Sequence, residues 1–221
     1  MIVRKDQKKL SESEWDDFTS AVSTIQDVDA SAPSYSSLAR IHTPRFHQGT
    51  AHRFPEFLPW HREYLWIFEN RLRLEHPDVT LPYWNWVEDR RIPSRLAKAS
   101  QWGVTRGMDA NDLVGDYKAE VDDASAQETF RGFHYSINSP HGGIHRDVGG
   151  TSGEMGNIMR SPEDILFWFH HCYLDKLWAD WQASNPNKEP SMTERLLPES
   201  FFTRTGGEVL RISDMDYSYA Q

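Results

Sequence analysis

Ten histidines occur in this chain of 221 residues, and the spacing of several suits a metal site. His141 and His145 are four residues apart, so on a helix both rings leave one face about one turn apart. His61 and His171 each begin or interrupt an apolar stripe with helical spacing. A single histidine on such a stripe is more often a core residue bonded to a backbone carbonyl. The metal interpretation therefore depends on whether these histidines converge.

His61 lies near the start of a predicted helix that runs to about residue 75. Leu65, Phe68 and Leu72 share its face, which we expect to be buried. Pro55 keeps His52 outside this helix and in the preceding loop.

Residues 42–52 form a predicted loop with three histidines: His42, His47 and His52. Either of the first two could join His52 and His61. A short helix over residues 34–42, ended by Pro44, places His42 at a helix end. This placement favours His42 over His47.

The second set of histidines lies on two further predicted helices. Ser139 as N-cap and Pro140 in the first turn predict a helix that begins there and carries His141 and His145. Gly142 and the glycine after it weaken this helix, and a bound metal would help to hold it.

A capping box at residues 161–164, with proline in the first turn, opens the most apolar helix, predicted over residues 165–183. His171 lies on its buried stripe. Asp175 follows four residues later, where a carboxylate could orient the His171 ring.

Elsewhere the predictions are local. Ser11 and Glu14 form a capping box for a helix over about residues 11–25. Short helices are expected near 92–100 and 109–120, and a short strand over 208–212. His76 and His134 have no place in the pattern and are expected to be solvated or locally bonded.

The candidate ligands are all neutral nitrogen donors, without cysteine or carboxylate. Imidazole suits copper, zinc, iron and nickel. Non-haem iron usually takes one carboxylate, so two sets of three histidines favour a pair of copper ions that reacts with dioxygen. A zinc-bound or purely structural bundle is the alternative.

Bulk composition excludes several classes of function. The net charge of −9 argues against binding to nucleic acid or to an anionic membrane surface. No apolar run approaches the roughly 18 residues that span a bilayer. Cys172 is the single cysteine, so no intramolecular disulfide is expected. Residues 1–6 lack the apolar stretch of a signal peptide, which predicts a cytoplasmic protein or one exported with a partner.

Four motifs of the chain resemble those of type-3 copper proteins: tyrosinases, catechol oxidases and other polyphenol oxidases, and haemocyanins. They are FLPWHREYLWIFE at 57–69 with His52 before it, LPYWNW at 81–86, HGGIH at 141–145, and SPEDILFWFHHCYLDKLWADWQ at 161–182. The resemblance extends over nearly the whole chain. It implies a mainly α fold: a four-helix bundle that holds a dinuclear copper site, wrapped by loops and a few short strands. Residues 1–221 would form one catalytic domain without a C-terminal lid domain.

The resemblance also implies which residues hold copper. The first copper would take His42, His52 and His61, and the second His141, His145 and His171. His170 would be a buried neighbour rather than a ligand. Cys172 lies far from His52 in sequence, so no thioether link is expected, as in bacterial members. Some bacterial relatives need a copper-loading helper protein, which is a possible partner here.

The chain departs from the family near His141. Many members carry a glutamate shortly before this ligand and an asparagine directly after it, which together hold a water that deprotonates monophenols. Here Gly142 follows His141, and the nearest preceding glutamate is Glu128. The polar candidates between them are Arg131, Asn138 and Ser139. Arg146 would lie at the pocket mouth, where it could attract an acidic substrate or simply face solvent.

These features predict oxidation of o-diphenols or o-aminophenols to o-quinones, with dioxygen as co-substrate reduced to water. Monophenol hydroxylation is expected to be weak, because a general base is missing or differently placed. A true tyrosinase with monophenolase activity and a haemocyanin-like oxygen carrier are the alternatives.

Overall fold

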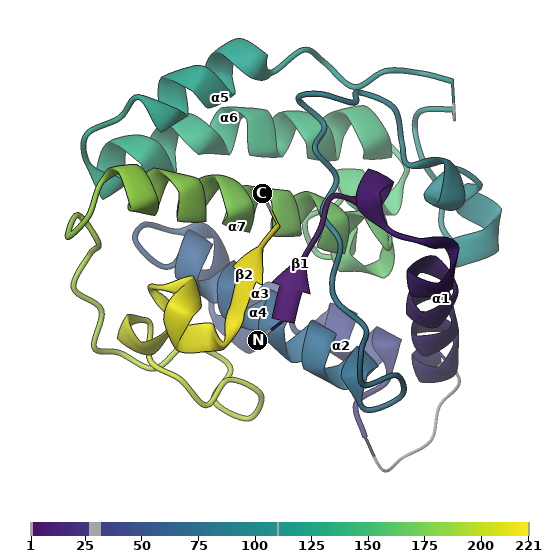
Figure 1. Ribbon diagram of the computed structural model, residues 1–221, viewed down its shortest axis with the longest axis horizontal. Helices are drawn as coiled ribbons and strands as arrows, with labels where there is room; N and C mark the ends of the chain where they lie inside the picture. Colours follow the sequence, from purple (N-terminus) through teal and green to yellow (C-terminus); the bar gives the residue numbers. More distant parts are fainter. Residues whose placement is uncertain (1, 27–31, 110, 221) are drawn as a thin grey trace.

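Three long helices form the centre of the protein: α4 (Phe57–Arg73), α6 (Phe130–Gly149) and α7 (Leu166–Ser184). The structure is a computed structural model that describes residues 2–26, 32–109 and 111–220 (Figure 1). The remaining helices are α1 (Glu12–Gln26), α2 (Tyr35–Arg40), α3 (Pro44–His47) and α5 (Lys118–Ser125), and the strands are β1 (Ile2–Arg4) and β2 (Tyr217–Tyr219). Short 3-10 turns and loops connect them. The prediction of a mainly α fold with few short strands is confirmed.

Helix α7 lies at the core because it is apolar around most of its circumference. Trp168 illustrates how it is held. Its ring stacks on Phe68 of α4 at a centroid distance of 3.7 Å, and its indole N–H donates to the carbonyl of Pro162. On another side, α7 contacts α6, which is covered in turn by α5 (Figure 1). The helix that carries His171 is therefore enclosed by other elements.

Helix α6 begins ten residues before the predicted start, with Thr129 instead of Ser139 as N-cap. The hydroxyl of Thr129 accepts the N–H of Gly132 and caps the helix, which then continues through Pro140. An internal proline costs a helix about 3 kcal/mol. The buried side chains of Ile137 and Ile144, on either side of the proline, offset this cost by packing into the core.

The glycines after His141 have a packing role that the sequence did not reveal. A Cβ atom on Gly143 would lie 2.3 Å from the ring of Tyr117, which is closer than atoms can approach. Glycine at this position therefore allows the segment before α5 to lie against α6. Close packing therefore requires glycine here, and the contribution of a bound metal to this helix stays a prediction.

The predicted capping box of α7 is wrong. Residues Ser161–Glu163 form a 3-10 turn, η6, and α7 starts at Leu166. The cap is Asp164, whose carboxylate accepts the N–H of Leu166 at 2.9 Å and binds the guanidinium of Arg106 through two contacts of 2.7 Å. The carboxylate of Asp164, paired with Arg106, therefore accepts the helix N–H bond that the sequence pattern assigned to Ser161.

Other local predictions have mixed outcomes. Ser11 and Glu14 form the expected capping box at the start of α1. Pro44 starts α3 instead of ending α2, so residues 42–52 contain a helical turn, followed by the 3-10 turn η2 (Thr50–His52).

Residues 92–100 hold only 3-10 turns. The helix expected over 109–120 begins at Lys118, and residue 110 lies outside the described residues. The strand expected at 208–212 is wrong, since η7 (Gly207–Val209) lies there.

The two strands bring the first and last described segments together. β1 and β2 pair in parallel, with Ile2 opposite Tyr217. Beneath them, Arg4 donates to Glu69 at 2.8 Å and to Asp175 at 3.4 Å, and Arg62 donates to Asp175 at 2.6 Å. Burial alone would raise the pKa of Asp175, but the two guanidiniums lower it below its ordinary value. The carboxylate is therefore an ionised link between α7, α4 and β1.

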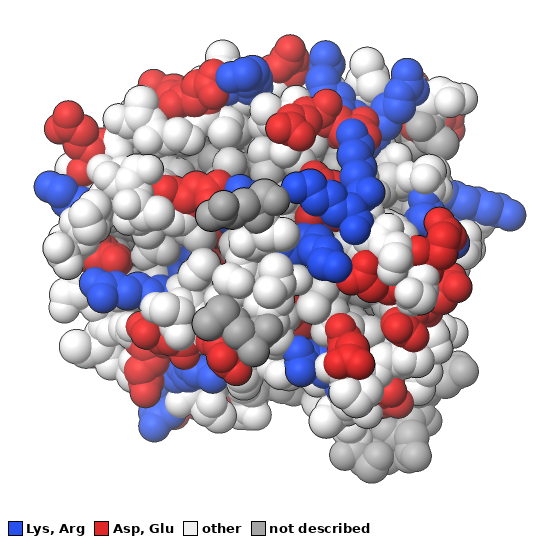
Figure 2. Space-filling view, in the orientation of Figure 1, with Lys and Arg blue, Asp and Glu red and all other residues white. Residues whose placement is uncertain are grey.

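The surface mixes both signs of charge. On the face that carries the strands, acidic and basic side chains are interspersed (Figure 2). Among the described residues, no helix combines the length and apolar character that crossing a bilayer requires.

Replacing the buried carboxylate is expected to destabilise the protein strongly. Asp175→Asn leaves Arg4 and Arg62 buried without their shared negative partner, and we expect a loss of about 3–5 kcal/mol in the free energy of unfolding. Denaturant titration followed by tryptophan fluorescence measures it.

Asp180→Asn is the matched control, since Asp180 lies on the same helix but forms an exposed pair with Lys176. It should change the free energy of unfolding by less than about 0.5 kcal/mol. Equal effects of the two substitutions would contradict the importance of the buried pair.

Candidate metal centre

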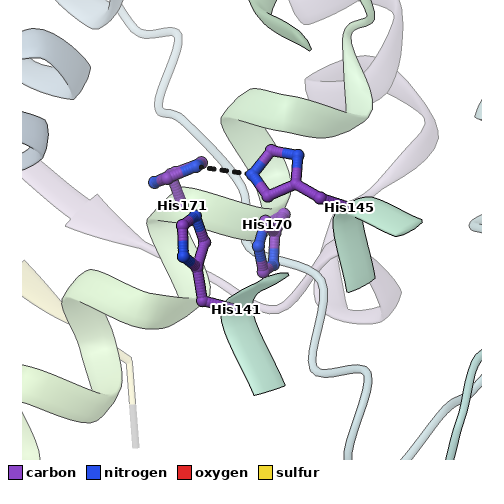
Figure 3. Close-up of side chains that lie close together, drawn as sticks. All are labelled: His141, His145, His170 and His171. Carbon is purple, nitrogen blue, oxygen red and sulfur yellow. Dashed lines mark hydrogen bonds between the residues drawn. The ribbon is translucent and has the colours of Figure 1, made fainter. Parts of the chain in front are cut away.

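Two groups of histidines converge between α4, α6 and α7. The first group is His42, His52 and His61, and the second is His141, His145, His170 and His171. Within each group, one ring nitrogen of every member lies within 4.8 Å of those of the others. In Figure 3 the rings of the second group project from α6 and α7 into one small volume. All six predicted ligands are thus brought into these two groups.

The secondary structure explains this convergence. His141 and His145 occupy successive turns of one face of α6, and His61 and His171 face each other from α4 and α7. The rings of His61 and His171 stack at a centroid distance of 4.2 Å with 11° between their planes. His42 lies two residues after the end of α2, and His52 ends η2. The two groups are therefore neighbours, as a dinuclear centre requires.

Backbone carbonyls orient three of the rings through Nδ1. The pairs are His42 with Ile158 at 2.8 Å, His61 with Phe57 at 2.8 Å, and His145 with Met155 at 2.9 Å. A carbonyl oxygen can only accept, so each Nδ1 carries the proton and each Nε2 presents a lone pair. Sequence reasoning missed these partners, because main-chain carbonyls leave no mark in a residue pattern.

In the first group, the Nε2 lone pairs of His42 and His61 point at each other. The Nε2 atoms of His42 and His61 are 3.2 Å apart, and neither bears a proton to share. In the second group, Nε2 of His145 is 3.2 Å from Nε2 of His171, while His141 Nε2 has no partner (Figure 3). Converging unprotonated nitrogens repel one another unless a cation lies between them. The donor set therefore fits a metal ion in each group.

Burial keeps these rings neutral. It lowers the pKa of His52 and of His145 to about 4, and it holds the pKa of His42, His61 and His141 well below the usual value. At neutral pH the rings can all donate a lone pair. Neutral imidazole without carboxylate or thiolate suits copper or zinc.

His47 is placed differently from His42. Its Nε2 donates to the carbonyl of His42 at 2.9 Å, and its Nδ1 accepts the N–H of Gly49 at 3.0 Å. Both ring nitrogens are thus used by the backbone. This arrangement supports the choice of His42 for the first group, with His47 fixing the loop that carries it.

His170 belongs to the second group by distance, but its chemistry differs. Its Nδ1 accepts the indole N–H of Trp86 at 3.1 Å. Indole can only donate, so the proton of the neutral His170 ring is on Nε2. With one nitrogen occupied and the other protonated, His170 is a neighbour of the site, which agrees with the expectation that it is not a ligand.

The prediction that Asp175 orients His171 is wrong. Its carboxylate is bound by Arg4 and Arg62, as described above, and by the hydroxyls of Tyr217 and Tyr219. Nδ1 of His171 has no hydrogen-bond partner. Two buried guanidiniums attract the carboxylate far more strongly than a neutral imidazole does, so Asp175 acts on the position of the helix instead.

A cavity of about 150 Å³ opens onto both groups. It is lined by His42, His52, His141, Gly142, His145, Met155, Gly156, Ile158 and Ser161. A cavity of this size holds a single benzene ring. The site can therefore admit one aromatic ring next to the imidazole nitrogens.

The three predicted pocket residues have different positions. Gly142 lines the cavity as expected. Arg146 is exposed, and its guanidinium lies 3.1 Å from where a Cβ on Gly142 would be, which places it beside the cavity wall. Asn138 is not among the lining residues, and its amide donates to the carbonyl of His134 at 2.7 Å.

His134 was expected to be solvated or locally bonded, but it is buried. It is 2% exposed, its Nδ1 has no partner, and burial lowers its pKa to about 4. The ring of Phe57 contacts both His134 and His141, at centroid distances of 5.8 and 4.8 Å, and His134 is not among the cavity-lining residues. His76, in contrast, is partly exposed and contacts Ser20, as predicted.

Comparison with known proteins identifies the family. The family described as the common central domain of tyrosinase matches residues 32–114 and 93–184, more than half of the chain. Tyrosinase from Streptomyces antibioticus is 30% identical over 85% of this chain and 85% of its own length. The chain belongs to the tyrosinase family. It is accordingly a copper oxidoreductase, and the family's dinuclear copper centre is consistent with the two histidine groups.

Solved structures of other type-3 copper proteins have the same fold. A functional unit of octopus haemocyanin superposes with a TM-score of 0.85 at 23% identity, over all of this chain and 68% of that one. A polyphenol oxidase from Thermothelomyces thermophila gives a TM-score of 0.79 at 18% identity, over all of this chain and 89% of that one. The helical core predicted from the family resemblance is therefore the observed one.

Metal-free protein is expected to lose stability in mild acid. The pKa values of His52 and His145 are near 4 in the folded state and near 6.5 in an unfolded chain. The unfolded chain thus binds more protons as the pH falls from about 6.5 towards 4, and the free energy of unfolding falls with it. Urea midpoints measured at pH 7 and pH 5 without metal test this, and an unchanged midpoint would contradict buried neutral rings.

His42 and His47 can be separated by metal content. Because His42 turns a free Nε2 towards His61, whereas His47 acts only through the loop that carries His42, we expect His42→Ala to lower the copper content after reconstitution much more than His47→Ala does. Elemental analysis after gel filtration measures both. Loss of copper in His47→Ala alone would reverse the assignment.

Proposed function

We propose that this protein oxidises o-diphenols, or related o-aminophenols, to the corresponding o-quinones while dioxygen is reduced to water. Two catechol molecules supply the four electrons and four protons that convert one dioxygen molecule into two waters. The observation that carries the proposal is the cavity of single-ring size bounded by both histidine groups. A small phenolic ring can reach the metal site there.

The residues that would hold the metal are His42, His52 and His61 for one ion and His141, His145 and His171 for the other. Bound there, copper would accept electrons from the substrate and transfer them to dioxygen. The protein fixes the rings through the carbonyl bonds at Nδ1, so little reorganisation is needed when an ion binds. Phe57 and Phe167 pack against His61 and His171 and keep water away from that side of the site.

Of the cavity-lining residues in the described part of the chain, only the predicted copper ligands could act as a base for a monophenol. Among the lining residues that the structure describes, none is a carboxylate, and Gly142 stands directly after His141. Glu128 is exposed and precedes α6. A catechol loses its proton more readily than a monophenol, so the missing base should slow hydroxylation more than diphenol oxidation.

Two other activities have some support. The Streptomyces relatives at 30% identity are named tyrosinases, which favours monophenol hydroxylation by a base that enters from outside the described wall. The similarity to octopus haemocyanin favours reversible oxygen binding. The cavity at the metal site argues for substrate oxidation over oxygen carriage.

Oxygen uptake with a matched pair of substrates tests the proposal. Copper-loaded protein should consume oxygen with 4-tert-butylcatechol, and roughly 100-fold more slowly with 4-tert-butylphenol, because a positioned base contributes about that factor. The two compounds differ only in the second hydroxyl. Comparable rates would show that a base is present, and no uptake with either would favour the oxygen carrier.

A further inference from the structure

One loop supplies the carbonyl partners of a ring in each histidine group. The carbonyl of Ile158 accepts from Nδ1 of His42, a member of the first group, at 2.8 Å. The carbonyl of Met155 accepts from Nδ1 of His145, a member of the second group, at 2.9 Å. The two carbonyls are three residues apart in a segment that contains no predicted ligand. We call this segment, residues 154–160, the bridging loop.

The bridging loop is bonded internally, so its two carbonyls keep a fixed separation. Asn157 lies between them in sequence. Its N–H donates to the carbonyl of Glu154 at 2.9 Å, its carbonyl accepts the N–H of Arg160 at 2.9 Å, and its side-chain oxygen accepts the N–H of Met159 at 3.0 Å. Because these bonds extend from one end of the loop to the other, a shift of either carbonyl moves the other with it.

Glu154 fastens the bridging loop to the rest of the protein. The residue is 7% exposed, and one of its carboxylate oxygens accepts the N–H of Thr105 at 2.7 Å. The other oxygen binds the guanidinium of Arg160 at 2.9 Å. The N–H of Glu154 also donates to the carbonyl of Thr105 at 3.3 Å. The carboxylate therefore ties the start of the loop both to its own end and to the neighbouring segment.

The end of α6 lies directly against the same loop. A Cβ atom on Gly149 would overlap the backbone nitrogen of Gly156, and one on Gly156 would lie 2.5 Å from the carbonyl oxygen of Gly150. Glycine at these positions allows one backbone to touch the other. Since packed protein interiors transmit small displacements, the position of α6, which carries His145, and that of the loop depend on each other.

We propose that the bridging loop couples the two metal sites, and that Glu154 is the positioning residue that holds the loop in place. When the second group binds an ion, the ring of His145 becomes fixed and fixes the loop through the carbonyl of Met155. The carbonyl of Ile158 then holds the ring of His42 in the orientation that the first group requires.

This coupling makes the binding of the two ions cooperative. A group that the loop has already ordered loses less conformational entropy when its own ion binds, so it binds that ion more tightly. The effect is reciprocal, because each group must change the affinity of the other by the same factor. The inference concerns the assembly of the metal centre and goes beyond the proposed oxidation of catechols.

Removing the fastening should weaken metal binding at both groups, although Glu154 is a ligand of neither. We expect Glu154→Ala to lower the affinity for each of two zinc ions roughly tenfold by calorimetry, as loss of a partner behind a metal ligand does. Glu154→Gln keeps an acceptor for the N–H of Thr105 and should recover most of the affinity. A loss that affects only one of the two ions would overturn the shared role.

Glu163→Ala is the matched control for this measurement. Glu163 binds the same guanidinium of Arg160 at 2.7 Å, but the pair is exposed and lies outside the bridging loop. Its removal should leave the affinity for both zinc ions unchanged. An effect equal to that of Glu154→Ala would overturn the assignment of the fastening to Glu154.

Proton exchange at the imidazoles tests the coupling directly. In His52→Ala the first group lacks a donor, so one zinc ion per chain should occupy the second group, which elemental analysis verifies. By NMR, this ion should slow exchange of the Nδ1 proton of His42 roughly fivefold, the effect of strengthening one hydrogen bond, although His42 belongs to the other group. Adding Glu154→Ala should abolish the slowing.

His61 is the internal control for the exchange measurement. Its Nδ1 proton is bonded to the carbonyl of Phe57, away from the bridging loop, and its ring stacks on His171. Zinc should leave exchange at His61 unchanged. Slowing at His61 as large as that at His42 would show that the groups communicate through the stacked rings, and slowing at neither would show that they are independent. Either result would overturn the inference.

The failure of this inference and the failure of the proposed function are distinguishable, because zinc supports no oxidation. Wild-type protein that binds fewer than two zinc ions would overturn the coupling, whatever its oxidase activity with copper. Absence of oxygen uptake with 4-tert-butylcatechol would overturn the proposed function, and the zinc measurements would still decide the role of Glu154.

Discussion

The constraint on which this structure depends is the burial of neutral imidazoles with their lone pairs facing one another. The nitrogens of His42 and His61 lie 3.2 Å apart without a proton between them, and carbonyl bonds at the far side of each ring prevent either from turning away. Such an arrangement is unfavourable in itself and becomes favourable when a cation binds. The long helices supply the rigid framework that keeps the repelling groups together.

The same framework needs an anchor for its most buried helix. Asp175 provides it one turn beyond His171, where it joins two arginines and two tyrosines from distant parts of the chain. Breaking a buried network of this kind is costly, because each remaining charge loses its compensation. The network that stabilises the fold therefore lies one turn from a predicted metal ligand, although Asp175 makes no hydrogen bond with the ring of His171.

Four of the predicted ligands, His61, His141, His145 and His171, followed from side-chain type and helical spacing, which are local properties of the sequence, whereas the full set with His42 and His52 was implied by the family resemblance. His141 and His145 needed only the period of a helix, and the apolar stripe of α7 placed His171 in the core. The misplaced features depend on partners far away in sequence. Pro140 lies within α6 because tertiary packing outweighs its helix-breaking tendency, and Asp164 replaces Ser161 as a cap because Arg106 approaches it. Local patterns contain neither piece of information.

The pairing of β1 with β2 has a consequence for the order of folding. Arg4 and Tyr219 are 215 residues apart, yet both bind the carboxylate of Asp175. During synthesis the helix that bears His171 emerges before Tyr219 does. Until then, β1 has no partner strand and Arg4 lacks its hydrogen bond to Tyr219. We expect so long a loop to close late in folding, because the chain loses conformational entropy before it gains any contact between the two strands. Strand β2 therefore completes the hydrogen bonds to Asp175 that stabilise α7. A nascent chain that already contains every histidine of the two groups still lacks these bonds until β2 is synthesised.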